Sequence, residues 1–294
     1  MTLAVEAPHT VRPLRQLSLE ITGRCQLTCD SLCYAKSGPK QGHGSMTEDD
    51  WNRILDEAAA LGVEEIQIIG GEPTLHPAFA RMLQRGIDAG LRIRVYTNLF
   101  RVRAAHWRLF EHPSVSLATT YHSSVAAEHD EVTDREGSHA ATRGNIVEAV
   151  RRGIRLSVAV LDGGDHERAE QARAEMKVLG VHKVRVSQVR PIGNAASAVL
   201  PSVSSLCGQC ANRKAAVLPN GLVAPCEIGR FLTAGSVKDT SLASVLASDR
   251  WAVLAASIPG RQDGTNLCPP DCAPNDDSGC GPDNSGPCGP ADDE

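Results

Sequence analysis

The sequence predicts an α/β protein in which a partial (β/α)6 barrel is followed by a small cysteine-rich domain. Six apolar runs rich in β-branched residues alternate with segments of helical periodicity. Successive runs begin 22 to 48 residues apart, a spacing typical of parallel strands joined by right-handed helical crossovers. Three cysteines lie within 25–33 and the other seven within 207–288. Buried cysteines of an ordinary core would be scattered, so this clustering points to ligands.

The repeating elements follow in order along the chain. The predicted strands are 17–21, 65–69, 92–97, 114–120, 155–161 and 183–189. The predicted helices are 47–62, 77–90, 104–113, 139–153 and 166–180. Thr47 precedes Asp50 by three residues, close to a capping box, and four of the five helices end at a glycine suited to a C-cap. Six units are fewer than the eight of a closed barrel, so an open doubly wound sheet is also compatible. In both architectures, ligands bind at the carboxyl ends of the strands.

The chain changes character after residue 190, where glycine, proline, aspartate and cysteine become frequent. We therefore expect an N-terminal extension at 1–16, the barrel at 17–195 and a second domain at 196–294. By composition the final segment would be a disordered acidic tail, but its cysteines could fold it around a metal.

Composition restricts the classes of function. The chain has 294 residues, 41% hydrophobic residues and a net charge of −5, without a strongly basic block, so a nucleic-acid duplex is not expected as the main partner. Neither a signal-peptide core nor a run of about 18 apolar residues is present, so we expect a cytoplasmic protein and no membrane partner. Ten cysteines in a reducing compartment indicate metal binding or catalysis rather than disulfides.

Cys25, Cys29 and Cys33 lie on the loop directly after the first predicted strand. Three thiolates on a [4Fe–4S] cluster leave one iron open for a ligand that does chemistry, whereas an electron-transfer cluster usually has four. A zinc site completed by a distant residue is an alternative, and so are three ordinary small loop residues.

The segment IIGGEPTLHP follows the second predicted strand. Gly70 and Gly71 allow the backbone to approach a ligand closely, and Glu72 adds a carboxylate suited to an ammonium group. A tight turn from strand to helix, with Pro73 beginning the exit, is the structural alternative.

Together these motifs resemble the radical S-adenosylmethionine (radical SAM) superfamily, in the branch with a SPASM-type C-terminal extension. The resemblance includes the cysteine loop, GGEP, VYTN at 95–98 and VRPIGNA at 189–195. It implies a TIM-like partial barrel followed by a SPASM-like domain. It also implies a [4Fe–4S] cluster whose open iron chelates the methionine moiety of S-adenosylmethionine, and a 5′-deoxyadenosyl radical that abstracts a hydrogen atom.

The resemblance further implies a set of cofactor-binding residues. Gly70, Gly71 and Glu72 would contact the methionine amino group, and Thr97 and Asn98 would lie near the ligand. Tyr34 follows the third cysteine and is also assigned to this set. Arg143 could pair with a ligand carboxylate or simply lie on a helix surface. The usual family spacing has three and then two residues between the cysteines, whereas here both gaps are three residues long.

The C-terminal cysteines resemble those that hold auxiliary clusters in SPASM domains. Cys207 and Cys210 precede a predicted hairpin with an Asn-Gly turn that ends near Cys226. The later cysteines are Cys268, Cys272, Cys280 and Cys288. Two fully ligated cubanes need eight cysteines and seven are present, so we expect one or two auxiliary [4Fe–4S] clusters. A zinc-ribbon-like tail is the alternative.

Several further polar residues follow the predicted strands: His76, His122, His129, Asp162 and Arg190. Each could face the mouth of the barrel, and each could equally be a capping or solvated loop group.

The function that the resemblance implies is radical modification, most often cross-linking, of a ribosomally synthesised precursor peptide. A radical dehydrogenase or epimerase acting on a small molecule is an alternative, although epimerisation would need a cysteine that is not an iron ligand. A zinc- or cluster-binding interaction module is the non-enzymatic alternative. An external electron donor is expected. Because only about 16 residues precede the first strand, a peptide substrate would need a separate leader-recognition protein or direct docking on the barrel mouth.

Overall fold

The computed structural model describes residues 14–29, 31–196 and 200–258. In these residues nine strands form one sheet in the order β6-β5-β4-β3-β2-β1-β7-β8-β9. The strands are β1 (Gln16–Glu20), β2 (Glu65–Ile69), β3 (Arg92–Tyr96), β4 (Val115–Tyr121), β5 (Leu156–Asp162), β6 (Lys183–Gln188), β7 (Lys214–Val217), β8 (Leu222–Ala224) and β9 (Gly235–Ser236).

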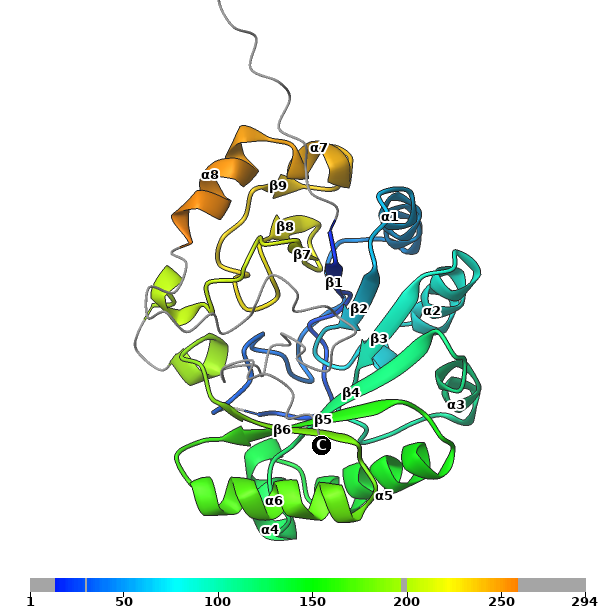
Figure 1. Cartoon of the computed structure of the whole chain (residues 1–294), viewed down its shortest axis with the longest axis vertical. Helices are drawn as coiled ribbons and strands as arrows, with labels where there is room; N and C mark the ends of the chain where they lie inside the picture. The colour runs from blue at the N-terminus through cyan, green and yellow to red at the C-terminus, as the bar shows by residue number, and fades with distance from the viewer. Residues whose placement is uncertain (1–13, 30, 197–199, 259–294) are drawn as a thin grey trace, which may run out of the picture.

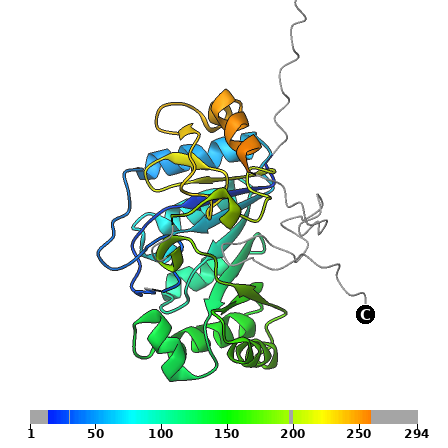
Figure 2. The ribbon, with the colours of Figure 1, turned by 90° about the vertical axis from the view of Figure 1, so that its left-hand side faces the viewer.

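The helices are α1 (Glu48–Ala60), α2 (Phe79–Asp88), α3 (Ala104–Phe110), α4 (Ala126–Thr133), α5 (Ser138–Arg151), α6 (His166–Val178), α7 (Leu242–Leu246) and α8 (Asp249–Ser257). Short 3-10 turns are η1 (Pro73–Leu75), η2 (Gly193–Ala196) and η3 (Val203–Ser205). Helices α1 to α6 lie on the outer side of the curved sheet, and the long loop between β1 and α1 lies within the curve (Figure 1). Figure 2 shows this loop, in blue, at the left edge of the molecule.

The predicted partial barrel is confirmed. Strands β1 to β6 pair in parallel, each with its predecessor in the chain. Every predicted strand agrees with the structure to within one residue at each end. The capping box at the start of α1 is also present, because Asp50 N donates to Thr47 Oγ1 at 3.2 Å and Thr47 N donates to Asp50 Oδ2 at 2.9 Å.

Helix α4 was not expected from the sequence. It is short, its N-terminus has no side-chain cap, and its buried residues are His129 and Thr133. A helix whose inward face is polar lacks the apolar periodicity by which helices are found in a sequence.

The segment expected to form a second domain continues the sheet of the barrel. Strand β7 pairs in parallel with β1, and β8 returns antiparallel after the predicted Asn220–Gly221 turn. Gly221 has a φ of +85°, which glycine adopts without strain. Leu242 and Ile54 belong to one apolar core, and the Leu242 N–H donates to Glu57 Oε2 at 2.6 Å. The two predicted regions therefore share both a sheet and a core in the described residues.

The described residues also bear on membrane insertion. None of the helices found there combines the length and the apolar composition that a bilayer span requires.

The shared core predicts one cooperative unfolding transition. Leu242→Ala and Ile54→Ala each remove a fully buried side chain, and each should lower the free energy of unfolding by about 2 to 5 kcal/mol. Denaturant titration followed by circular dichroism should show the same single transition shifted in both variants. Val178→Ala, at a residue that is 86% exposed, should change stability by less than about 0.5 kcal/mol. Two separate transitions, each shifted by only one core variant, would contradict the shared core.

Candidate active site

A cavity lies at the carboxyl ends of β1 to β6, where the sheet fold brings the strand-to-helix loops together. Its empty volume, including the open mouth, is about 1140 Å³. It is lined from the β1 loop by the three cysteines, from the β2 loop by Gly70 and Gly71, and from the β3 loop by Thr97 and Asn98. Ligand sites are expected at this edge of a parallel sheet.

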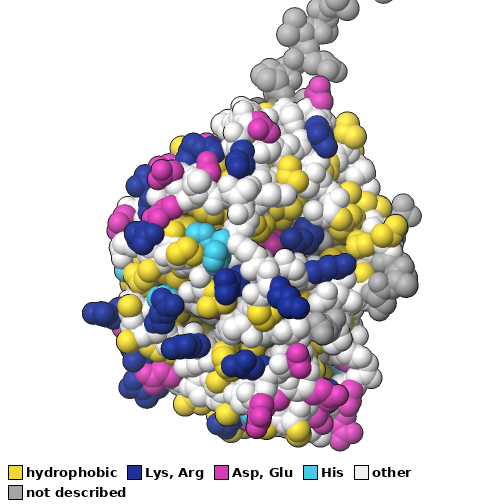
Figure 3. Space-filling view, turned by 180° about the vertical axis from the view of Figure 1, so that it is seen from behind, with side chains coloured by type: hydrophobic (Ala, Val, Ile, Leu, Met, Phe, Trp, Pro, Cys, Tyr) yellow, Lys and Arg dark blue, Asp and Glu magenta, His cyan; other side chains and the backbone are white. Residues whose placement is uncertain are grey.

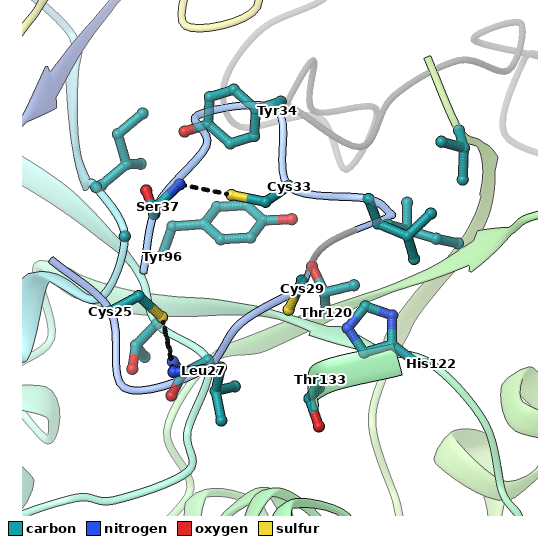
Figure 4. Close-up of a pocket in the computed structure, with 18 of the residues that line it drawn as sticks. Cys25, Leu27, Cys29, Cys33, Tyr34, Ser37, Tyr96, Thr120, His122 and Thr133 are labelled. Atoms are coloured by element: carbon teal, nitrogen blue, oxygen red, sulfur yellow. Dashed lines mark hydrogen bonds between the residues drawn. The ribbon is translucent and has the colours of Figure 1, made fainter. Parts of the chain in front are cut away.

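Cys25, Cys29 and Cys33 all line this cavity (Figure 4). Cys33 N donates to Cys29 O at 3.1 Å, a helix-like turn that places both residues on the same side of the loop. Two thiols accept backbone hydrogen bonds, Cys25 Sγ from Leu27 N at 3.4 Å and Cys33 Sγ from Ser37 N at 3.3 Å. Such N–H···S contacts stabilise thiolate ligands and tune the potential of an iron–sulfur cluster.

Gly70 and Gly71 allow the cysteine loop to lie directly against the end of β2. A Cβ atom would meet Thr22 O at 2.5 Å from Gly70, and Arg24 O at 2.5 Å from Gly71. Two backbone hydrogen bonds of 2.8 Å join the cysteine loop to the end of β2, from Gly71 N to Thr22 O and from Glu72 N to Arg24 O. The two glycines are therefore required by the loop itself as well as by any ligand at the cavity surface.

The far end of the cysteine loop is held by Gly193 and Asn194, from the VRPIGNA segment after β6. Asn194 N donates to Cys33 O at 2.8 Å and Asn194 Nδ2 donates to Cys29 O at 3.1 Å. A Cβ atom at Gly193 would overlap Tyr34 O and Cys33 O. The segments after β1 and β6 are thus joined by hydrogen bonds to the carbonyl groups of two cysteines.

Glu72 is buried and connects the loops after β2 and β3. Its Oε1 accepts from Thr74 Oγ1 at 2.6 Å and from Thr97 Oγ1 at 2.9 Å, and its Oε2 accepts from Asn98 N at 2.8 Å. Burial raises the pKa of Glu72, against the opposing effect of these bonds. Glu72 is not among the residues that line the cavity, and its carboxylate holds Thr97 and Asn98 in place.

Asn98 in turn contacts the cysteine loop. Its Nδ2 lies 3.5 Å from Cys25 Sγ, and its Oδ1 accepts from Gln26 Nε2 at 3.0 Å. The chain turns sharply beyond it, with Leu99 at a φ of +54°, and Thr142 Oγ1 donates to Asn98 O at 3.1 Å. The side chains of the third loop are therefore fixed relative to the first thiol.

The three thiols of this loop are ligands of the kind that hold an iron–sulfur cluster. In the described ranges, no three His, Cys, Asp or Glu side chains are grouped closely enough to hold one metal ion. Burial raises the pKa of the Cys25 thiol to about 12, so this thiolate needs a cation beside it.

A second group of cysteines lies at the far side of β1. Cys210 Sγ is 2.8 Å from Cys226 Sγ, and the Cys207 thiol contacts Cys210. Cys226 Sγ also accepts from Gly229 N at 3.2 Å. The predicted partners Cys268, Cys272, Cys280 and Cys288 lie outside the described residues.

Charged side chains meet at the carboxyl end of β1. Arg230 Nη1 lies 2.9 Å from Glu20 Oε1, and Ser18 Oγ donates to Glu227 Oε2 at 3.0 Å. Burial raises the pKa of Glu20 to about 7, although Arg230 opposes this shift. Tyr34 lines the cavity and has a pKa raised well above its usual value by burial and by Glu20. These residues join the end of β1 to the loop after Cys226.

The structure separates Arg143 from the other predicted ligand contacts. Its Nε donates to Glu175 Oε1 at 2.7 Å, its side chain is 41% exposed, and it does not line the cavity. Arg143 therefore lies on the surface of helix α5, which was the alternative to pairing with a ligand carboxylate.

The predicted histidines and Asp162 also divide into residues that line the cavity and residues that do not. His122 and His129 line the cavity, and His122 Nδ1 has no hydrogen-bond partner among the described residues. Burial lowers the pKa of His122 to about 3, so the ring is neutral. His76 Nδ1 instead accepts from Ala78 N at 3.1 Å, and Asp162 accepts from Gly164 N at 2.8 Å. The last two are local capping groups.

Some cavity residues were not predicted from the sequence. Tyr96, Thr120 and Gln188 lie on or beside predicted strand ends, and the alternation of inward side chains could have indicated them. Thr133 belongs to the unexpected helix α4, and Ile228 comes from the segment beyond the barrel. Only the folded arrangement brings these two to the cavity.

Comparison with known proteins identifies the family. Residues 19–179, more than half of the chain, match the model of the radical SAM superfamily. The PqqA peptide cyclase of Ruegeria pomeroyi is 31% identical over 214 residues, which are 67% of this chain and 54% of that protein. The sporulation killing factor maturation protein SkfB of Bacillus subtilis is 26% identical over 144 residues, which are 49% of this chain and 34% of that protein. The chain thus spans about half the length, or less, of these relatives.

Solved structures share the fold. Streptococcus suis SuiB bound to its precursor peptide SuiA superimposes with a TM-score of 0.70 at 13% identity, over 88% of this chain and 70% of SuiB.

The close approach at Gly71 predicts a specific defect. Gly71→Ala places a methyl group where Arg24 O lies, so the cysteine loop should shift and iron bound per chain after anaerobic reconstitution should fall. Gly144→Ala is the matched control, since a Cβ atom there meets nothing within 4 Å. Iron content and the visible absorbance of the cluster would measure the difference. Equal iron loading in the two variants would show that the loop tolerates displacement.

Proposed function

The chain belongs to the radical SAM superfamily, and we propose that it is a peptide-modifying member that cross-links a ribosomally synthesised precursor peptide. The proposal rests on one observation above all: three thiols of one loop line an open cavity at the carboxyl ends of a partial barrel. The relatives named peptide cyclase and maturation protein support a peptide as the substrate.

Cys25, Cys29 and Cys33 would hold a [4Fe–4S] cluster at the cavity wall. When bound, this cluster supplies the electron that cleaves S-adenosylmethionine into methionine and the radical that abstracts a substrate hydrogen atom. The N–H groups of Leu27 and Ser37 stabilise two of the thiolates, and Asn194 fixes the loop from the opposite side.

S-adenosylmethionine would bind beside this loop. Gly70, Gly71, Thr97 and Asn98 line the wall next to the cysteines, and Tyr34 lines the side toward β1. Glu72 contributes by holding Thr97 and Asn98 in place. The cavity walls limit the access of bulk water, which protects a reactive radical from side reactions.

The substrate would enter through the mouth and expose one C–H bond to the radical. Forming a new bond between two C–H sites removes a pair of hydrogens: one is abstracted as an atom, and the other leaves as a proton and an electron. An auxiliary cluster held by Cys207, Cys210, Cys226 and some of the later cysteines would take up that electron. An external donor must reduce the first cluster, and a separate leader-recognition protein could deliver the peptide.

The proposal predicts that S-adenosylmethionine cleavage depends on the first cysteine loop. The anaerobically reconstituted, dithionite-reduced protein should form 5′-deoxyadenosine. A variant with Cys25, Cys29 and Cys33 all changed to Ala should form only background amounts. Chromatography of the nucleoside product measures this directly.

Ser31→Ala is the control, since Ser31 is an exposed residue of the same loop and should retain activity. A fully iron-loaded parent protein that forms no 5′-deoxyadenosine, with or without added precursor peptide, would refute the proposed function.

A further inference from the structure

We propose that the cavity accepts an uncharged side chain of the substrate peptide with a hydroxyl or carboxamide group, and that His122 recognises this group. The inference rests on the proposed function, because it assigns the class of residue that the site accepts. Two observations carry it: an unpaired imidazole nitrogen on a residue of the cavity wall, and a wall with almost no charged side chains.

His122 directly follows strand β4, and the alternation of the strand turns its side chain toward the cavity. The preceding Tyr121 points outward: its hydroxyl group donates to Glu175 Oε2 at 2.8 Å and lies 2.7 Å from His139 Nε2. Residues on either side of an outward residue face inward in a strand. Thr120 and His122 accordingly both line the cavity (Figure 4).

The imidazole ring of His122 is held in place by contacts that leave its polar atoms unused. In the described residues, both hydrogen bonds of His122 use its main chain: N donates to His129 Nδ1 at 3.4 Å, and O accepts from Arg168 Nε at 3.3 Å. The ring packs edge-on against the ring of His129, with 5.2 Å between centroids. The Nδ1 atom is buried and has no partner among the described residues. Because buried polar groups are as a rule hydrogen-bonded, we infer that a ligand group supplies the partner.

The cavity wall differs in charge from the outer surface. Figure 3 shows Lys, Arg, Asp and Glu side chains spread over one face of the molecule, and these types make up 22% of the sequence. Among the described residues that line the cavity, Arg190 is the single member of these types, and its Nη1 donates to Ser205 O at 3.1 Å. Burying a charged side chain without a partner is costly. The wall therefore favours an uncharged side chain.

The carboxylates of helix α4 do not change the charge of the wall. Glu128 pairs with Arg168, with 3.2 Å between Oε2 and Nε. Asp130 accepts from Gly137 N and from His139 N, both at 2.7 Å. No carboxylate of α4 lines the cavity, although the helix contributes other residues to the wall.

The chemistry of a neutral imidazole indicates the class of side chain. Burial lowers the pKa of His122 to about 3, so the ring offers one N–H donor and one acceptor nitrogen. Hydroxyl and carboxamide groups likewise offer both a donor and an acceptor. In the proposed function, the charged groups of S-adenosylmethionine bind the open iron, beside the wall formed by Gly70 and Asn98. His122 is not among the residues assigned to that cofactor, and we assign it to the substrate.

Binding can be measured without turnover, because no reductant is added. The reconstituted protein with S-adenosylmethionine is used to select from a display library of randomised heptapeptides. The selected sequences should share a position occupied by Ser, Thr, Asn or Gln. A synthetic peptide with Asn or Gln at that position should bind about tenfold more tightly than its Asp or Glu counterpart. It should also bind about tenfold more tightly to the parent protein than to His122→Phe.

Matched variants separate recognition from folding. His122→Gln keeps a hydrogen-bonding side chain and should retain the preference of the parent protein. His112→Phe makes the aromatic change at an exposed residue just before the other end of β4, and it should select the same peptides as the parent protein. All three variants should bind iron and S-adenosylmethionine as the parent protein does. A merely structural role for His122 would lower iron binding together with peptide binding.

Four results would overturn the inference. They are selected peptides that share no position, a shared position occupied by Asp, Glu, Lys or Arg, the same selection by the parent protein and His122→Phe, and loss of S-adenosylmethionine affinity in His122→Phe. The last result would assign His122 to the cofactor. Failure of the proposed function is read separately, as absence of 5′-deoxyadenosine from the reduced, iron-loaded parent protein.

Discussion

The candidate site depends on the direct backbone contact between the cysteine loop and the end of β2. Thr22 O and Arg24 O occupy the space where side chains of residues 70 and 71 would otherwise lie, so only glycine permits the two hydrogen bonds that fix the loop. The same loop is held at its other end by Asn194 and beside its first thiol by Asn98. Segments after strands β1, β2, β3 and β6 are thereby combined into one wall. The cysteines are therefore positioned by backbone contacts with the ends of the strands.

The second set of cysteines is coupled to the first through β1. Strand β7 extends the sheet on the side of β1 opposite β2, so the segment carrying Cys210 and Cys226 is placed by the barrel's own hydrogen-bond pattern. Glu20, at the end of β1, contacts Arg230 shortly after Cys226. Truncating one member of such a buried pair usually costs more than the pair contributes, because the other charge remains buried. If the second set of cysteines holds an auxiliary cluster, as proposed, this connection fixes its separation from the first set.

Much of this arrangement could be predicted from the sequence, and the limits have physical causes. The six strands were found because parallel strands buried on both faces are continuous apolar runs. The cysteine loop and the two glycines were found by their spacing. The glycines were expected to let a ligand approach, whereas the contact that requires them in the structure is with the cysteine loop. Helix α4 was missed because its buried face carries His129 and Thr133. Arg143 was assigned to the ligand because a guanidinium suits a carboxylate, but Glu175 supplies that carboxylate within the protein. The contribution of Ile228 required the pairing of β7 with β1, which local sequence does not encode.

The central claim is that Cys25, Cys29 and Cys33 leave one iron of their cluster open to S-adenosylmethionine. The most direct measurement is electron–nuclear double resonance on the reduced, reconstituted protein with S-adenosylmethionine labelled with 15N at its amino group. A hyperfine coupling of the labelled nitrogen to the reduced cluster, lost in the triple Cys→Ala variant, is the predicted result. A fully reduced, iron-loaded protein in which S-adenosylmethionine binds without any coupling would show that the nitrogen does not reach iron, and would contradict the claim.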